Sequence, residues 1–155
     1  MIIKKLVLHN FRVFRGTHEI DLSPRKEKGL SKPIVLFGGL NGAGKTSILT
    51  AVRFALYGRL AFEHLVNNQD YINQLNELIH NGINNTQRPK EASVSLTFTY
   101  NKDGKESEFT VIRSWERDKK DQLFLQQDGE ALTELNYDQC QGFLNELIPS
   151  GIADL

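Results

Sequence analysis

A glycine-rich stretch carries the clearest chemistry in this sequence. Residues 39–46 read Gly-Leu-Asn-Gly-Ala-Gly-Lys-Thr and match the phosphate-loop pattern G-x-x-x-x-G-K-S/T at every fixed position. Gly39, Gly42 and Gly44 are expected to curl the backbone with positive φ, so that its N–H groups reach phosphate oxygens that a side chain would obstruct. The stretch therefore predicts a site for a nucleoside triphosphate.

The other residues of this stretch have distinct expected roles. Lys45 is expected to place its ammonium group on the β and γ phosphates, which makes it the expected catalytic residue. The Thr46 hydroxyl is expected to complete the coordination of Mg²⁺. The loop leads into the N-terminus of a helix, whose unpaired N–H groups favour an anion. The backbone from Asn41 through Ala43 to Ser47 is therefore expected to hold the phosphates.

The surrounding sequence favours this interpretation over a glycine-rich turn that matches by accident. The apolar run Ile34–Phe37 precedes the stretch and predicts a strand. A helical pattern follows, starting at Thr46, with apolar residues at three- and four-residue spacing up to a stop at Tyr57 and Gly58. Strand, loop and helix in this order are the context that the motif requires.

Composition indicates a soluble globular domain. The 155 residues are 39% hydrophobic and 25% charged, which is enough for a core. No apolar run approaches the roughly 20 residues of a membrane-spanning helix. Lys4 and Lys5 interrupt any signal-peptide core, so we expect a cytoplasmic protein with no membrane contact. The single Cys140 cannot form an internal disulfide and is not expected to be catalytic.

Charge is uneven along the chain, although the net charge is zero. Residues 1–30 hold seven Lys or Arg against three Asp or Glu. A basic amino end is compatible with contact to nucleic acid, but a solvated face is the more ordinary explanation for most of these side chains. Composition alone therefore does not establish DNA binding.

The expected elements place two strands before the phosphate loop and an antiparallel meander after its helix. The first two strands are expected at Ile2–Leu8 and Thr17–Leu22, with an exposed loop over Ser23–Lys32. The remaining elements are a helix at Gln69–His80, strands at Val94–Tyr100, Phe109–Trp115 and Leu123–Gln127 with turns at Asp103-Gly104 and Asp128-Gly129, and a helix at Asn136–Ile148. Trp115 and the phenylalanines fall at strand periods and are expected in the core.

The predicted fold class is α/β: a P-loop NTPase with an antiparallel β meander flanking the P-loop helix. Small GTPases and nucleotide kinases would instead continue with alternating helices and parallel strands. The arrangement fits the amino-terminal lobe of an ABC-type ATPase head. The sequence contains neither a Walker B element, four apolar residues before an Asp, nor a signature such as Leu-Ser-Gly-Gly.

Three segments carry a resemblance to a known group. Asn10-Phe11-Arg12, residues 41–49 and Ala55-Leu56-Tyr57-Gly58 resemble the amino-terminal half of SMC-like ATPases, including the break-repair ATPase that partners the Mre nuclease. Within that group, residues 36–46 and 147–155 look most like DndD, the ATPase component of bacterial DNA sulfur modification, in which sulfur replaces a non-bridging phosphate oxygen.

The resemblance implies that residues 1–155 are the amino-terminal lobe of an SMC-like head. In such proteins a coiled coil and a carboxyl lobe with the signature and Walker B motifs follow. ATP and Mg²⁺ are the implied cofactors, with ATP held between two heads. The implied partners are the carboxyl lobe, a second head, DNA and other sulfur-modification proteins. Since hydrolysis needs a Walker B carboxylate, the ATPase activity is expected of the full-length protein and hardly of this chain alone.

The resemblance also suggests residues outside the loop. Arg12 matches an arginine beside the nucleotide in the break-repair relatives, although a surface salt bridge is an equal alternative. His80–Ile83 corresponds by position to a segment near the base. The histidines show no metal spacing, and three glutamines, Gln126, Gln127 and Gln139, are not expected to be the Q-loop residue.

Two other functions remain open at this point. A DNA-repair or anti-phage ATPase unrelated to sulfur would have the same motifs. A non-hydrolytic interaction module with a vestigial loop is the alternative of another class, and the intact Lys45 and Thr46 argue against it.

Overall fold

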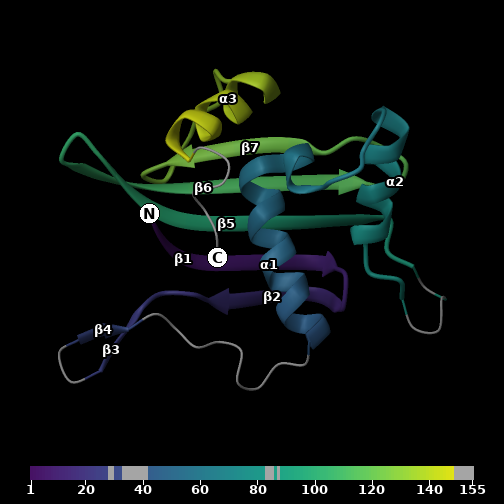
Figure 1. Cartoon of the computed structure of the whole chain (residues 1–155), viewed down its shortest axis with the longest axis horizontal. Coiled ribbons are helices and arrows are strands. Elements are labelled where there is room, and N and C mark those ends of the chain that lie inside the picture. Colours follow the sequence, from purple (N-terminus) through teal and green to yellow (C-terminus); the bar gives the residue numbers. More distant parts are fainter. Residues whose placement is uncertain (28–29, 33–41, 83–85, 87, 149–155) are drawn as a thin grey trace.

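A six-stranded antiparallel sheet forms the body of the protein, and a long helix crosses one of its faces (Figure 1). The computed structural model describes residues 1–27, 30–32, 42–82, 86 and 88–148. The sheet has the strand order β2-β1-β5-β6-β7-β8. The elements are β1 Ile2–Phe11, β2 Phe14–Asp21, β3 Arg25–Glu27, β4 Leu30–Lys32, α1 Gly42–Tyr57, the 3₁₀ helix η1 Gly58–Ala61, α2 Asn68–Leu78, β5 Glu91–Lys102, β6 Lys105–Glu116, β7 Gln122–Gln127, β8 Glu130–Ala131 and α3 Tyr137–Leu147.

The hairpin of β5 and β6 confirms the predicted start of the meander. Asp103 and Gly104 connect the strands with φ of 54° and 79°, and two positive φ angles are what a tight hairpin turn of this kind requires. Alternate residues face the helices, so Phe98 and Phe109 pair across the strands with ring centroids 5.6 Å apart. The period-two pattern thus defines the buried face.

Two differences from the sequence-based expectations concern the region around the phosphate loop, and a third expectation there is untested. The exposed loop expected at Ser23–Lys32 is wrong in part, because β3 and β4 pair there as a short antiparallel hairpin. Polar sequence does not prevent such pairing, since the hydrogen bonds join backbone groups. The helix expected from Thr46 already begins at Gly42. The predicted strand Ile34–Phe37 lies outside the described residues.

The core lies between α1 and the inward face of the sheet. Phe54 of α1 contacts Trp115 of β6 edge to face, with ring centroids 5.2 Å apart. The Trp115 indole Nε1 donates a hydrogen bond to Leu75 O in α2 at 2.9 Å, so one side chain ties three elements. The expected core position of Trp115 is confirmed, whereas Phe124 is 53% exposed because it points to the opposite face of β7.

A charged side chain occupies the same core. Arg113 lies between Val111 and Trp115 in β6, on the inward face, and is fully buried. Its Nη1 is 2.9 Å from Asp121 Oδ2 and its Nε donates to Ala55 O at 3.0 Å. The guanidinium also lies over the Phe54 ring, 5.4 Å from the centroid.

Gly58, which ends α1, is fitted to this arginine. Its φ is +57°, and a Cβ added there would lie 2.9 Å from Arg113 Nη1. The expected helix stop at Gly58 is therefore confirmed, with two separate reasons for glycine: the left-handed backbone and the closeness of the guanidinium.

Substituting Gly58 should cost more stability than the backbone conformation alone explains. Gly104 provides the control, because its φ is +79° and an added Cβ would meet nothing within 4 Å. Gly104→Ala should lower the free energy of unfolding by about 1–2 kcal/mol, the usual cost of a left-handed residue. Gly58→Ala should lower it clearly further, as measured by urea unfolding. Equal losses would show that Arg113 moves aside freely.

Candidate nucleotide site

The N-terminus of α1 presents the phosphate-loop residues that the structure describes. Gly42 begins the helix, Lys45 and Thr46 are exposed, and Ser47 is fully buried. The first-turn N–H groups of any helix lack intrahelical acceptors and carry the positive end of its dipole. No acidic residue occupies the first turn, so no side chain of that turn neutralises this end.

The backbone conformation of the loop glycines differs from the expectation. Gly42 and Gly44 lie within the helix, and neither is among the residues with positive φ in the described part of the chain. Positive φ at these two positions is therefore a wrong prediction. Helical geometry already points the first-turn N–H groups outward along the axis, so no reversal of the backbone is needed. Gly39 and Asn41 lie outside the described residues.

Two observations test whether this end of the helix fits a nucleotide phosphate. The Oγ of Ser47 is buried and has no hydrogen-bond partner in the described part of the chain. A Cβ placed on Gly42 would meet none of the described atoms within 4 Å, so the backbone is approachable there. A cationic Lys45, the hydroxyl of Thr46 and this open backbone suit a phosphate with Mg²⁺.

Arg12 lies beside the same helix. Its backbone has φ of +49°, with the N–H donating to Leu78 O at 2.8 Å, which fixes the turn between β1 and β2 against the end of α2. Its Nη1 approaches Thr50 Oγ1 at 3.5 Å. Because Thr46 and Thr50 are four residues apart, they share one face of α1. The guanidinium is thus about one helical turn from the phosphate end.

The alternative role for Arg12 was a surface salt bridge. Among the described residues Arg12 forms no ion pair, and its side chain is half-buried against α1. This geometry leaves the guanidinium next to the expected phosphate site without a carboxylate partner from the described chain.

The segment predicted to lie near the base adjoins Arg12. His80 N donates to Asn10 O at 2.8 Å, and His80 Nδ1 donates to Arg12 O at 2.6 Å. Arg12, His80 and Asn81 line a cavity of about 470 Å³ with the end of α2. The structure therefore brings Arg12 and His80 together, 68 residues apart in sequence, while Ile83 lies outside the described residues.

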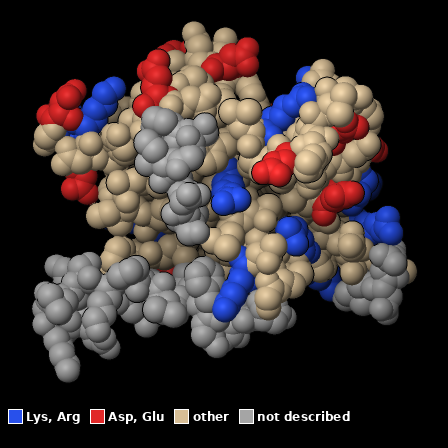
Figure 2. All heavy atoms as spheres, viewed as in Figure 1, with Lys and Arg blue, Asp and Glu red and all other residues tan. Residues whose placement is uncertain are grey.

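Surface charge is consistent with an anion site along α1. The helix contains Lys45 and Arg53 and no acidic residue. Figure 2 shows Lys and Arg side chains over the part of this face that α1 crosses, whereas Asp and Glu side chains gather at the upper edge and over α2.

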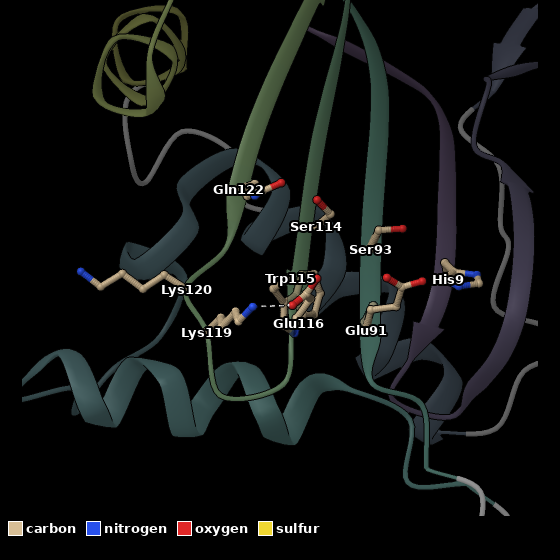
Figure 3. A pocket seen from close by; sticks show the side chains of 10 residues that line it. His9, Glu91, Ser93, Ser114, Trp115, Glu116, Lys119, Lys120 and Gln122 are labelled. Atoms are coloured by element: carbon tan, nitrogen blue, oxygen red, sulfur yellow. Dashed lines mark hydrogen bonds and ion pairs between the residues drawn. The ribbon is translucent and has the colours of Figure 1, made fainter.

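A second polar hollow lies where β5 begins and β6 ends, outside the predicted site (Figure 3). The side chains that line it include His9, Glu91, Lys119 and Lys120. Lys119 Nζ donates a hydrogen bond to Glu116 Oε2 at 2.8 Å. This hydrogen bond lowers the pKa of the Glu116 carboxyl. None of the described phosphate-loop residues lines this hollow, so we assign it no part of the nucleotide site.

Two other residues considered in the sequence, Cys140 and Gln139, have structural roles. Cys140 is buried, and this burial raises the pKa of its thiol, which disfavours the reactive thiolate. Gln139 accepts a hydrogen bond from Asn136 N at 2.9 Å in the capping box of α3. No group of three potential metal ligands occurs among the described residues.

The sequence did not predict the side chains that donate hydrogen bonds to the C-terminal carbonyls of α1. Arg113 and Gln141 contact the last carbonyls of this helix, Ala55 O and Leu56 O. One signal was available: the strand alternation places Arg113 on the apolar face, and a buried arginine needs partners.

An antiparallel sheet packed on a helix that begins with a phosphate-loop sequence defines a P-loop NTPase of the SMC-head fold. The SMC head domain from Thermotoga maritima matches with a TM-score of 0.51 at 23% identity, over 85% of this chain and 39% of that one. The Smc head domain from Pyrococcus yayanosii matches with a TM-score of 0.54 at 21% identity, over 94% of this chain and 25% of that one. The chain belongs to the AAA domain family AAA_23, whose model matches residues 5–153.

A curated relative matches a shorter stretch. The SbcC component of the nuclease SbcCD from Vibrio cholerae serotype O1 is 44% identical over 54 residues, which is 35% of this chain and 5% of that protein. The chain therefore spans a small part of this relative and between a quarter and two fifths of the solved structures. None of the described helices is long and apolar enough to cross a membrane.

Arg12 can be tested for a role at this site. If its guanidinium contacts a bound nucleotide, Arg12→Ala should weaken Mg-ATP binding about tenfold or more, the usual scale for losing a hydrogen bond to a charged group. Arg15→Ala, an arginine in the neighbouring strand β2, should leave the affinity unchanged. Calorimetric titration measures both. Unchanged affinity in Arg12→Ala would remove this residue from the site.

Proposed function

We propose that this chain binds Mg-ATP as the amino-terminal lobe of an SMC-like ATPase that acts on DNA. The observation that carries the proposal is the N-terminus of α1. This end of the helix carries the phosphate-loop motif, and its first turn holds no acidic residue. Lys45 is exposed there, and the buried Oγ of Ser47 has no hydrogen-bond partner in the described chain. The SMC-head fold and membership of AAA_23 support the assignment of class.

Each residue has a defined part in binding. The N–H groups of Gly42 to Ser47 donate to phosphate oxygens, and Lys45 adds a cation beside them. Thr46 supplies a hydroxyl ligand for Mg²⁺, which when bound neutralises phosphate charge. Arg12 and the cavity beside His80 receive the nucleoside side of the ligand.

Turnover is assigned to the full-length protein. The sequence holds no Walker B carboxylate, so a carboxyl lobe and a second head complete the site in this proposal. The match to a small part of the SbcC relative supports a longer protein of which this chain is one lobe.

Calorimetry with Mg-ATP tests the binding proposal. The chain should bind, and Lys45→Ala should weaken binding at least about tenfold because a charge-assisted hydrogen bond is lost. Lys105→Ala, in the β5–β6 hairpin away from α1, is the matched control and should bind normally. Adding the carboxyl lobe should produce turnover. If no mixture binds nucleotide, the chain is an interaction module and the loop is structural.

We propose sulfur modification of DNA as the process this ATPase serves. The support is the resemblance of residues 36–46 and 147–155 to DndD. The alternative is an ATPase of break repair or anti-phage defence, and its support is the 44% identity over 54 residues to a nuclease subunit, SbcC.

The two processes are separated by one measurement in cells. If sulfur modification depends on this ATPase, cells in which the Lys45→Ala variant replaces the full-length wild-type protein should contain no phosphorothioate in their DNA. Mass spectrometry of the digested nucleotides measures this. The wild-type protein in the same cells is the control. Unchanged phosphorothioate would reject the sulfur branch and leave the nuclease-associated one.

A further inference from the structure

A polar network around a buried ion pair joins three helices at one side of the core. Its centre is the ion pair of Arg113 and Asp121, whose side chains are 0% and 1% exposed. Tyr71 of α2 donates to Asp121 Oδ1 at 2.6 Å, and Tyr137 of α3 donates to Asp121 Oδ2 at 2.9 Å. Burial raises the pKa of both phenols, so they remain neutral donors at physiological pH.

The same network holds the C-terminal end of α1. Arg113 Nε donates to Ala55 O at 3.0 Å, and Gln141 Nε2 of α3 donates to Leu56 O at 3.0 Å. Gln141 Oε1 in turn accepts from Arg113 Nη2. Gln141 thus uses both ends of its amide and joins α3 to α1.

The opposite ends of α1 and α2 flank the candidate nucleotide site. From Ala55, α1 runs back ten positions, about 15 Å, to Lys45. From Tyr71, α2 runs forward seven positions, about 10 Å, to Leu78, whose carbonyl holds Arg12 N. Each helix is a rigid connection between the network and one half of the site.

We propose that Arg113, Asp121 and Gln141 are positioning residues that set the separation between the phosphate-binding end of α1 and the cavity beside Arg12 and His80. The inference rests on the proposed function, since it concerns the same nucleotide site. A ligand that reaches both halves depends on this separation, whereas a ligand that contacts only the phosphate-binding end does not.

Gln141 is the residue through which this can be tested. It is neutral and half-buried, so its substitution leaves the buried charges paired with each other, unlike substitution of Arg113 or Asp121. Gln141→Met keeps the length of the side chain and removes the hydrogen bonds to Leu56 O and Arg113, together with a bond to Asn145 within α3. α3 then keeps its apolar contacts but loses the polar link to the end of α1.

The experiment compares two ligands, Mg-ATP and inorganic tripolyphosphate with Mg²⁺, by calorimetry on the whole chain. Gln141→Met should weaken Mg-ATP about five- to tenfold, within the range of coupling between sites, and leave tripolyphosphate unchanged. Lys45→Ala should weaken both. Gln126→Met, the same substitution on β7 outside the network, should change neither.

A second control separates positioning from lost stability. Leu125→Ala removes a buried side chain of β7 that makes no hydrogen bond in the network, so it lowers the melting temperature. It should leave both affinities unchanged. If Gln141→Met leaves Mg-ATP binding unchanged, or weakens both ligands equally, the positioning role is wrong while the proposed function stands. If wild type binds neither ligand, or Lys45→Ala binds as wild type does, the proposed function fails and the inference falls with it.

Discussion

The fold depends on one buried ion pair, Arg113 with Asp121. Removing two charges from water costs several kcal/mol per ion, and the pair offsets this only if its remaining donors and acceptors are satisfied. Here the guanidinium finds a helix carbonyl and an amide, and the carboxylate finds two phenols. Because these partners come from α1, α2 and α3, the helices are held in one arrangement around the pair.

The ion pair also completes the electrostatics of α1. This helix has no basic residue in its last turn, although its C-terminal carbonyls carry the negative end of the dipole. Arg113 of β6 supplies the missing cation from outside the helix, at Ala55 O. The two ends of α1 therefore differ: Arg113 places a cation at the C-terminus, whereas the first turn holds no acidic residue and includes Lys45, which favours an anion there.

Local sequence patterns predicted the parts of the fold that local forces decide. Asp103-Gly104 specifies a tight hairpin by backbone conformation, and the apolar spacing after the phosphate-loop motif predicted a helix there, which is α1. The hairpin of β3 and β4 was missed because strand pairing joins backbone groups, which a polar composition does not reveal. Positive φ at Gly42 was wrong because a motif specifies residue types but not where the helix starts.

The buried network could not be predicted because its members are far apart in sequence. Tyr71 and Asp121 are 50 residues apart, and Gln141 and Leu56 are 85 apart. Alternation places Arg113 in the core, but many acidic residues could have been its partner. For the same reason the sequence predicted only one of the two reasons for glycine at position 58. It indicates a helix stop there, whereas the closeness of Arg113 is a feature of the tertiary structure.

The starts of α2 and α3 explain how the pair tolerates burial. Each helix begins with a capping box, on Asn67 and Asn136 respectively, which fixes its N-terminal turn. Tyr71 is the fourth residue of α2 and Tyr137 the first of α3, and both reach Asp121. Two phenol donors from the first turns of α2 and α3 thus reach the carboxylate, while a carbonyl of the last turn of α1 accepts from the guanidinium. Each charge therefore meets hydrogen-bonding groups held by fixed helix turns, and because a buried pair needs such partners, this arrangement of the helices reduces the cost of burying it.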